Sequence, residues 1–189
     1  MTTIHTPRLT LRPWQMSDFD DFYEYAKHPD VGTHAGWKPH ESREESAEIL
    51  VKFIESDDVW AIELKENSKV IGQLKIYPDE NRGKFSESNS AKLINYALSK
   101  EYWGLGYATE AVKCAVKYLF EEMETEILTA FHFPNNNGSK RVIEKCGFSY
   151  ECTIAQGYKN YNGQIYDSVC HSMLKSEYEQ LKQNGGFTP

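Results

Sequence analysis

Two glycines separated by a single residue, Gly104 and Gly106, stand between a strand-like segment and a helix-like segment. Residues 91–98 alternate as a half-buried strand does, and apolar residues recur at helical spacing over 108–119. Glycine has no Cβ, so its backbone can take a positive φ and lie directly against a ligand. The first amides of a helix have no internal acceptor and favour a phosphate or pyrophosphate. The pattern therefore predicts an anion-binding turn, and the alternative is a tight strand-to-helix turn without a ligand.

The spacing around this turn disfavours two common nucleotide sites. A dinucleotide fingerprint requires a third glycine where this chain has Thr109, and no Gly-Lys-Ser/Thr sequence follows as in a P-loop. The first strand of a dinucleotide-binding fold is also buried on both faces and apolar throughout, whereas 91–98 alternates. The ligand of the turn is therefore expected to be a different phosphate compound.

Length and composition are typical of a soluble globular protein. The 189 residues fit one domain, 1–189, and 40% of them are apolar. We expect a cytoplasmic protein, because no apolar signal core opens the chain and no apolar run is long enough to span a membrane. The net charge of −7 disfavours a nucleic-acid partner and fits a cationic substrate slightly better, although an acidic surface also serves solubility.

Cysteine and histidine spacings do not predict a metal site. The four cysteines form no C-x-x-C pair, and in a reducing compartment we expect buried thiols, with a disulfide as the alternative. His28, His34 and His40 are six residues apart and no cysteine accompanies them, so no metal is expected.

Periodicity and turn residues predict a mixed α+β fold with helices on a largely antiparallel sheet, in the order β-α-α-β-β-β-α-β-α-β-β. Loops are expected at 28–40 and 79–90, where proline, glycine and polar residues gather. The strands of this order are expected at 8–12, 59–64, 70–77, 91–98, 127–133, 148–154 and 164–174, and its helices at 19–27, 42–55, 108–122 and 139–146. A further strand at 157–161, joined to 164–174 by a hairpin turn at Asn162-Gly163, and one or two helical turns at 177–183 are also expected.

Several motifs resemble those of one enzyme family. Residues 96–111 (YALSKEYWGLGYATEA) resemble the acetyl-CoA signature of the GNAT N-acetyltransferases. The sequence NNGS at 136–139 followed by EKCGF at 144–148 is similar to a second signature of their ribosomal-protein-acetylating (Rim-type) branch. Residues 6–13 (TPRLTLRP) resemble that branch's first strand, and Gly163 with Asp167 resembles its last hairpin. One departure is Glu101, where the family often has Gln or Arg.

The resemblance implies a binding site for acetyl-CoA as co-substrate. It places the pantetheine arm beside Tyr96 to Leu98, where a backbone amide near Leu98 polarises the thioester, and it places the pyrophosphate on amides of 103–108. The residues it implies for acetyl-CoA binding are Ala97, Leu98, Trp103, Gly104, Leu105, Gly106, Tyr107, Ala108, Thr109, Asn136 and Ser139.

The resemblance also suggests catalytic roles. Ser139 matches the position proposed to donate a proton to the CoA thiolate; the alternative is a residue that caps or opens a helix. Asn136 is either a contact to the pantetheine or a cap of that same helix. Tyr96 is the candidate assigned to acid–base chemistry, while Glu63, Glu151, His132 and a water relay remain alternatives as the base.

The implied activity is N-acetyl transfer from acetyl-CoA to a primary amine, such as a protein N-terminus or a small amine. Direct attack in a ternary complex is expected, because no cysteine occupies a nucleophile position. The alternative is a non-catalytic acyl-CoA-binding sensor or interaction module with the same fold. The expected partner is the amine acceptor, with no nucleic acid and no membrane, and the chain is expected to be a monomer or homodimer.

Overall fold

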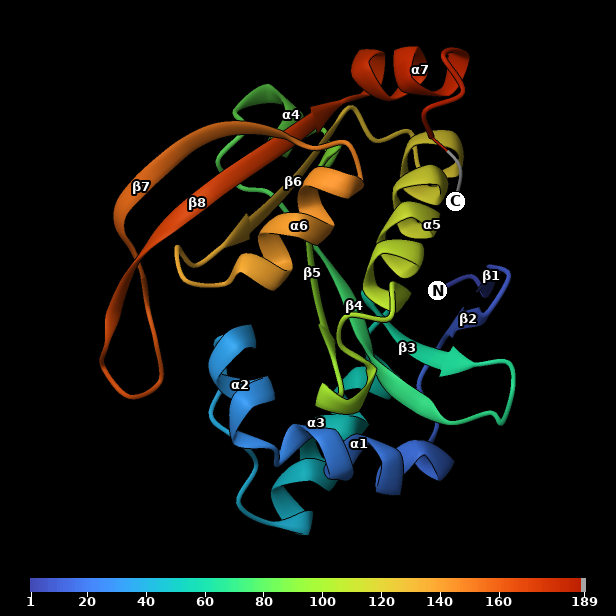
Figure 1. Ribbon diagram of the computed structural model, residues 1–189, viewed down its shortest axis with the longest axis vertical. Coiled ribbons are helices and arrows are strands. Elements are labelled where there is room, and N and C mark those ends of the chain that lie inside the picture. Colours follow the sequence, from blue (N-terminus) through green and yellow to red (C-terminus); the bar gives the residue numbers. More distant parts are fainter. Residues whose placement is uncertain (188–189) are drawn as a thin grey trace. The chain divides into compact units, whose positions relative to one another are not determined.

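A computed structural model describes residues 1–187 and shows a mixed α+β fold (Figure 1). An open, mostly antiparallel sheet of eight strands has the order β1-β2-β3-β4-β5-β6-β8-β7 and is flanked by helices, which confirms the predicted fold class. The strands are β1 (Ile4–His5), β2 (Leu9–Arg12), β3 (Val59–Leu64), β4 (Val70–Pro78), β5 (Ala91–Leu98), β6 (Ile127–His132), β7 (Ser149–Lys159) and β8 (Ile165–Leu174). The helices are α1 (Phe19–Ala26), α2 (Pro29–Ala35), α3 (Arg43–Glu55), α4 (Lys84–Glu87), α5 (Tyr107–Glu122), α6 (Asn137–Lys145) and α7 (Lys175–Gln183), with 3-10 turns η1 (Met16–Asp18) and η2 (Lys100–Tyr102).

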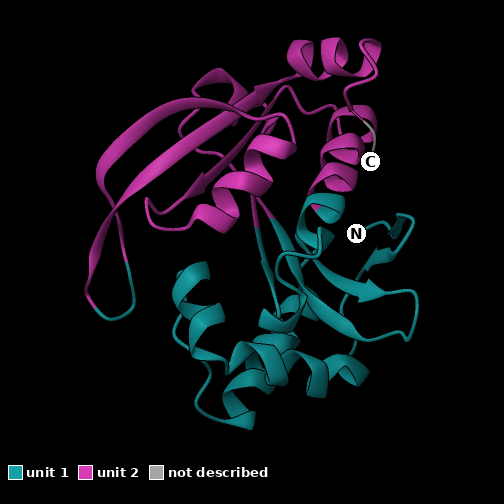
Figure 2. Cartoon of the chain, in the orientation of Figure 1, with its two compact units in different colours: residues 1–75, 96–111, 160–162 teal, residues 76–95, 112–159, 163–189 magenta. Residues whose placement is uncertain are grey.

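The chain divides into two compact units (Figure 2). Unit 1 contains residues 1–75, 96–111 and 160–162, and unit 2 contains 76–95, 112–159 and 163–189. The division falls inside β4, β5 and α5, so each of these elements contributes residues to both units.

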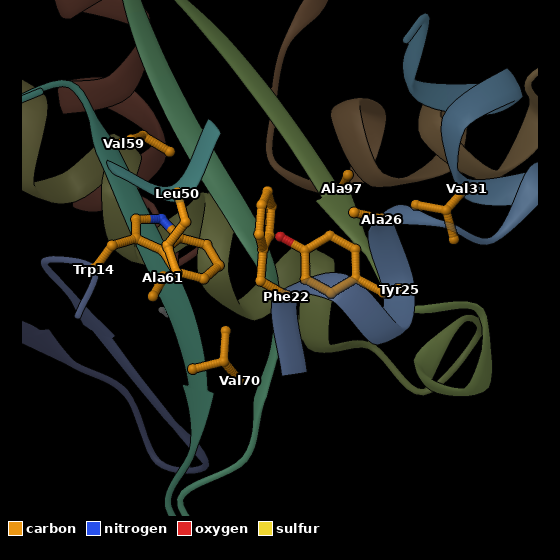
Figure 3. Packing of buried hydrophobic residues seen from close by; sticks show 10 residues of the cluster. All are labelled: Trp14, Phe22, Tyr25, Ala26, Val31, Leu50, Val59, Ala61, Val70 and Ala97. Carbon is orange, nitrogen blue, oxygen red and sulfur yellow. The ribbon is translucent and has the colours of Figure 1, made fainter. Parts of the chain in front are cut away.

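Unit 1 is built on an antiparallel meander, in which β2 pairs with β1 and with β3, and β3 pairs with β4. Its core contains Trp14, Phe22, Tyr25 and Leu50, all less than a twentieth exposed (Figure 3). The Trp14 and Phe22 rings meet edge to face with centroids 5.2 Å apart, a favoured aromatic geometry. The apolar stripe of α1 therefore packs into this core, as its spacing predicts, whereas in α3 Leu50 is buried and Val51 and Ile54 of the predicted stripe are exposed.

The segment 28–40 corrects one prediction, because it contains a helix, α2, where a loop is expected. Pro29 occupies the start of α2, where its missing N–H costs nothing. The His28 ring nitrogen Nδ1 accepts a hydrogen bond from the Asp30 amide at 3.2 Å, and Gly36 ends the helix with a φ of 86°. The proline and glycine that suggest a loop are the start and stop signals of a short helix.

Unit 2 contains the parallel pair β5–β6 and the antiparallel pairs β6–β8 and β7–β8. The two strands expected at 148–154 and 157–161 form a single long strand, β7, whose pairing shifts register between Ile154 and Tyr158. The loop expected at 79–90 includes the short helix α4. Among residues 1–187, no helix is both long and apolar enough to cross a bilayer.

The four cysteines are free thiols with different exposure. Cys114 and Cys146 are buried, as expected, but Cys152 is exposed and Cys170 is partly exposed. The prediction of four buried thiols is therefore wrong for the two cysteines on β7 and β8, because β7 is exposed along nearly its whole length and β8 is only partly buried.

Candidate functional site

The turn between β5 and α5 has the conformation that its glycines suggest. Gly104 has a φ of 76° and Gly106 a φ of 85°, values at which a side chain is strained. A Cβ built at Gly104 would meet no heavy atom within 4 Å. Trp103 and Leu105, which flank Gly104, are 39% and 55% exposed. We call residues 103–106 the glycine turn.

Backbone amides at the start of α5 are available to a ligand. The first helical hydrogen bond runs from the Glu110 amide to the Gly106 carbonyl at 3.0 Å. The amides of 105–108 lie upstream of that bond, so they have no acceptor within the helix, and the dipole of this 16-residue helix is positive at the same end. Tyr107, Ala108 and Thr109 form the first turn of α5 and are half-buried. The Trp103 amide, in contrast, donates to the Lys100 carbonyl at 3.1 Å.

Arg8 and Glu110 clamp the glycine turn from the side, an arrangement that the sequence analysis misses. Arg8 Nε lies 2.6 Å from Glu110 Oε2, and Arg8 Nη1 donates to the Leu105 carbonyl at 3.1 Å. The guanidinium carbon lies 4.2 Å from the centroid of the Tyr107 ring. Thr6 Oγ1 and the Arg8 amide both donate to Glu110 Oε1, at 2.6 and 2.8 Å.

The Glu110 carboxylate is stabilised in its charged form. Burial alone raises the pKa of this carboxyl, but the hydrogen bonds from Thr6 and Arg8 and the charge of Arg8 outweigh it and hold the pKa below its usual value. The signal for this clamp lies in two motifs 102 residues apart, Thr6-Pro7-Arg8 and Ala108-Thr109-Glu110.

The end of β5 is fixed by contacts of its backbone. Trp103 Nε1 donates to the Leu98 carbonyl at 2.8 Å, and the Ser99 amide donates to the Ile71 carbonyl at 2.7 Å. Ala97 and Leu98 are buried, whereas Tyr96 is half-buried. A Cβ built at Gly72 on β4 would lie 2.2 Å from the Ala97 carbonyl oxygen, so only glycine allows this close approach.

Unit 2 holds the second predicted motif at the start of α6. Asn136 is the residue before the helix, and its Oδ1 accepts a hydrogen bond from the Ser139 amide at 3.0 Å. Asn136 thus caps α6, which confirms the capping alternative, and Ser139 lies in the first helical turn with its side chain half-buried.

β5 pairs in parallel with β6, with Ala91 opposite Ile127 and Leu93 opposite Thr129.

Two of the candidate bases, Glu151 and Glu63, are hydrogen-bonded to arginine side chains. Both oxygens of Glu151 accept hydrogen bonds from Arg82, at 2.6 and 2.7 Å, and this contact holds the pKa of the carboxyl below its usual value. Glu63 Oε2 accepts from Arg12 Nε at 2.6 Å. The lowered pKa makes Glu151 a weak base that is poorly suited to accept a proton.

His132 presents a different environment. Its Nδ1 lies 2.8 Å from the Phe133 carbonyl, and its Nε2 is buried with no hydrogen-bond partner. Because a carbonyl oxygen can only accept a hydrogen bond, Nδ1 is a nitrogen that carries a proton. Among residues 1–187, no group of three or more His, Cys, Asp or Glu side chains is arranged to hold a metal ion.

The order of strands and helices, with the glycine turn between β5 and α5, defines a fold that solved acetyltransferases share. The structure is similar to that of a GNAT-family acetyltransferase from Bacillus anthracis, with a TM-score of 0.82 and 22% identity over 93% of this chain and 99% of that one. It is also similar to spermidine N-acetyltransferase from Vibrio cholerae, solved in complex with CoA and spermine, with a TM-score of 0.75 and 19% identity over 92% and 99% of the two chains.

Sequence comparison identifies the family. A family model described as acetyltransferase (GNAT) domain matches residues 8–149. An uncharacterized N-acetyltransferase, p20, from Bacillus licheniformis is 26% identical over 183 residues, which cover 94% of this chain and 99% of that protein. The chain belongs to the GNAT acetyltransferase family, whose members use acetyl-CoA.

Proposed function

We propose that residues 1–189 form a single acetyltransferase domain that transfers an acetyl group from acetyl-CoA to a primary amine by direct attack in a ternary complex. The observation that carries this proposal is the glycine turn. Its positive-φ glycines lie next to the amides of Tyr107 and Ala108, which have no acceptor within α5. A turn of this kind suits the pyrophosphate of acetyl-CoA, because amides and helix dipole act together on the same anion.

Two parts of unit 1 are assigned to acetyl-CoA. We assign its pyrophosphate to the amides of 105–108, where Gly104 allows close approach. We assign its pantetheine arm to the backbone of Tyr96 to Leu98. Trp103 supports this second assignment indirectly, because its indole fixes the Leu98 carbonyl and so the end of the strand.

Three of the four cysteines, all but the exposed Cys152, are poorly suited to form a covalent acetyl-enzyme, which supports direct attack. Burial raises the pKa of the Cys146 thiol to about 12, and burial is also the main reason that the pKa of Cys170 is raised to about 11. Thiols with such pKa values are almost entirely protonated at neutral pH and are poor nucleophiles. Cys114 is also buried.

We assign the proton transfers to two hydroxyl groups. The acceptor ammonium must lose a proton before its nitrogen attacks the thioester, and the departing thiolate must gain one. Ser139 is assigned to the thiolate, since a hydroxyl donates without a shifted pKa. Tyr96, half-buried on β5, is assigned to proton transfer at the acceptor side. Asn136 is assigned to the pantetheine through the side-chain nitrogen, because its oxygen caps α6.

The acceptor is proposed to be a polyamine-like small amine or a protein N-terminus. The solved spermidine N-acetyltransferase of similar fold supports the first class, and the NNGS and EKCGF motifs, which resemble those of the Rim-type branch, support the second. The net charge of −7 favours a cationic acceptor in either case. We propose that this reaction takes place in the cytoplasm.

Binding and turnover are tested separately. Acetyl-CoA is expected to raise the thermal midpoint of the protein, because a ligand that binds only the folded state stabilises it by mass action. CoA release is then measured with spermidine, with peptides bearing a free N-terminus and with the same peptides acetylated. Release with free amines alone supports the proposal. Binding without release for any amine contradicts transfer, and the absence of a thermal shift contradicts the donor site.

Ser139→Ala and Asn136→Ala separate chemistry from folding. Asn136→Ala removes the cap of α6 and is expected to lower the free energy of unfolding by about 1 kcal/mol. Ser139→Ala keeps the amide that the cap requires, so stability and acetyl-CoA affinity are expected to be retained while the rate constant falls by about tenfold or more. An unchanged rate constant would remove Ser139 from the mechanism.

A further inference from the structure

Two cysteines face each other across the β7–β8 hairpin. Cys152 on β7 and Cys170 on β8 are directly paired in the antiparallel register. Directly opposed residues in such a pair have Cα atoms about 4.5–5.5 Å apart, within the range of about 4.4–6.8 Å that a disulfide spans. The backbone therefore already holds these two residues at a separation that a disulfide requires.

A bulge in β7 is what brings Cys152 opposite Cys170. Tyr150 pairs with His171 and the next pair is Cys152 with Cys170, so Glu151 is an extra residue on β7. Without the bulge, Glu151 would lie opposite Cys170. The carboxylate of Glu151 is held by two hydrogen bonds from Arg82, at 2.6 and 2.7 Å, so the bulge is anchored by an ion pair.

The two thiols differ in access to solvent. Cys152 is exposed, whereas Cys170 is partly buried and its thiol donates to the Ser168 carbonyl, with Sγ and the oxygen 3.6 Å apart. Cys114 and Cys146 are instead buried. The chain therefore contains one thiol that a small oxidant can reach, and that thiol has a second thiol beside it.

We propose that Cys152 and Cys170 are a site of reversible oxidation, at which a low-molecular-weight disulfide converts the two thiols into a cross-strand disulfide. The Cys152 thiolate attacks one sulfur of the small disulfide, which forms a mixed disulfide and releases one small thiolate. The Cys170 thiolate then attacks Cys152 Sγ, which closes the protein disulfide and releases the second small thiolate. The protein loses two hydrogens, and the small disulfide is reduced to two thiols.

The order of the two steps follows from the environments of the thiols. Burial, and then the neighbouring Cys152, raise the pKa of the Cys170 thiol to about 11, so few Cys170 thiolates exist to start the reaction. Once Cys152 carries the mixed disulfide, Cys170 needs only to attack a sulfur that is already adjacent. Cys152 is therefore the entry point and Cys170 the resolving thiol.

The test treats the folded full-length chain with mixtures of reduced and oxidised glutathione. Mass spectrometry without reductant is expected to show a species that has lost two hydrogens, and peptide mapping is expected to join Cys152 to Cys170. The reduced form should return when the ratio is reversed. A wild-type protein that accumulates a stable glutathione adduct on Cys152, or a disulfide-linked dimer, would overturn the proposal.

Cysteine variants test which thiol forms the mixed disulfide and which thiol then attacks it. Cys170→Ser is expected to stop at the glutathione adduct on Cys152, and Cys152→Ser is expected to remain unmodified. Cys114→Ser, a matched change at a buried cysteine, should form the disulfide as the wild type does. The oxidised wild type should also melt at a higher temperature than the reduced form, because the cross-link restricts the unfolded chain. If Cys170→Ser also loses the mass of two hydrogens, Cys170 is not the thiol that closes the disulfide.

Discussion

Arg8 and Glu110 are joined by a 2.6 Å ion pair, although 102 residues separate them in the chain. The pair ties the first residues of the meander to the first turn of α5. Because Arg8 also donates to the Leu105 carbonyl and lies over the Tyr107 ring, it contacts both sides of Gly106. A Cβ at Gly106 would come within 3.4 Å of Arg8 Nη2, so the guanidinium follows the turn closely. The shape of the proposed pyrophosphate site thus depends on a residue near the N-terminus, far from the turn in the sequence.

Replacing Arg8 with glutamine is expected to weaken acetyl-CoA binding about tenfold, which corresponds to about 1.4 kcal/mol. Glutamine cannot supply the forked, charged contacts that hold Glu110 and the Leu105 carbonyl together. Isothermal titration calorimetry measures the affinity. Arg43→Gln is the matched control, because Arg43 also combines an ion pair, with Asp20 at 2.6 Å, and an aromatic contact, with Phe19 at 4.5 Å. Equal affinities for the two variants would contradict a role of Arg8 in shaping the turn.

Local patterns predict much of this fold and little of this clamp. The strands at 59–64 and 91–98 have the predicted bounds, because alternation with period two is a property of neighbouring residues. The contact of Arg8 with Glu110 is formed by tertiary structure, and no local spacing encodes it. Arg8 and Glu110 each lie inside a segment that resembles a GNAT motif. The motifs do not indicate that the two residues contact each other.

The elements that sequence reasoning misses have a similar cause. Helix α2 depends on His28 accepting a hydrogen bond through its ring, a cap that the usual capping residues do not suggest. The bulge at Glu151 depends on Arg82, which lies 69 residues earlier in the chain. Short elements that are stabilised by side chains outside the periodic pattern are therefore the ones that local sequence signals fail to predict.

Substitution of Gly104 by alanine is expected to reduce acetyl-CoA affinity by about tenfold or more. The positive φ of 76° strains alanine, and the added methyl group would point into the open space that the proposal assigns to the pyrophosphate. Gly163→Ala provides the control, because Gly163 has a φ of 82° and equally open surroundings. Both variants should lose similar stability in urea unfolding. A comparable loss of affinity in Gly163→Ala would show that backbone strain, not the site, is responsible.

Gly72→Ala is expected to destabilise the protein by about 1–3 kcal/mol or more, because the new methyl group would lie 2.2 Å from the Ala97 carbonyl oxygen. The obstacle is backbone, which cannot move aside as a flexible side chain does. Gly138→Ala is the control, because its new methyl group has room. Gly138 lies in the first turn of α6, where an added Cβ would be 3.5 Å from Asn136 Oδ1, an ordinary van der Waals distance.

Because alanine restricts the unfolded chain more than glycine does, Gly138→Ala should be neutral or stabilising by about 0.4–1 kcal/mol. Urea unfolding of both variants measures these differences. A mild effect of Gly72→Ala would mean that β4 and β5 are able to separate locally.

The burial of His171 is expected to make the free energy of unfolding fall as the pH drops below 6.5. His171 and His132 are 3% and 5% exposed, with ring centroids 5.3 Å apart. Burial first, and then the neighbouring His132, lower the pKa of His171 from 6.5. The unfolded chain therefore binds protons at a pH where folded His171 remains neutral, so acid favours unfolding. Above 6.5 the ring is neutral in both states and this dependence disappears.

His171→Phe tests this effect, because phenylalanine keeps an aromatic ring beside Tyr150 and removes the titration. The free energy of unfolding, measured in urea across pH 6.5, should depend less on pH in this variant than in the wild type. Some dependence should remain, since burial also lowers the pKa of His40. His5→Gln, at an exposed histidine, should leave the wild-type profile unchanged. If His171→Phe retains the full wild-type slope below pH 6.5, the burial of His171 is not its source.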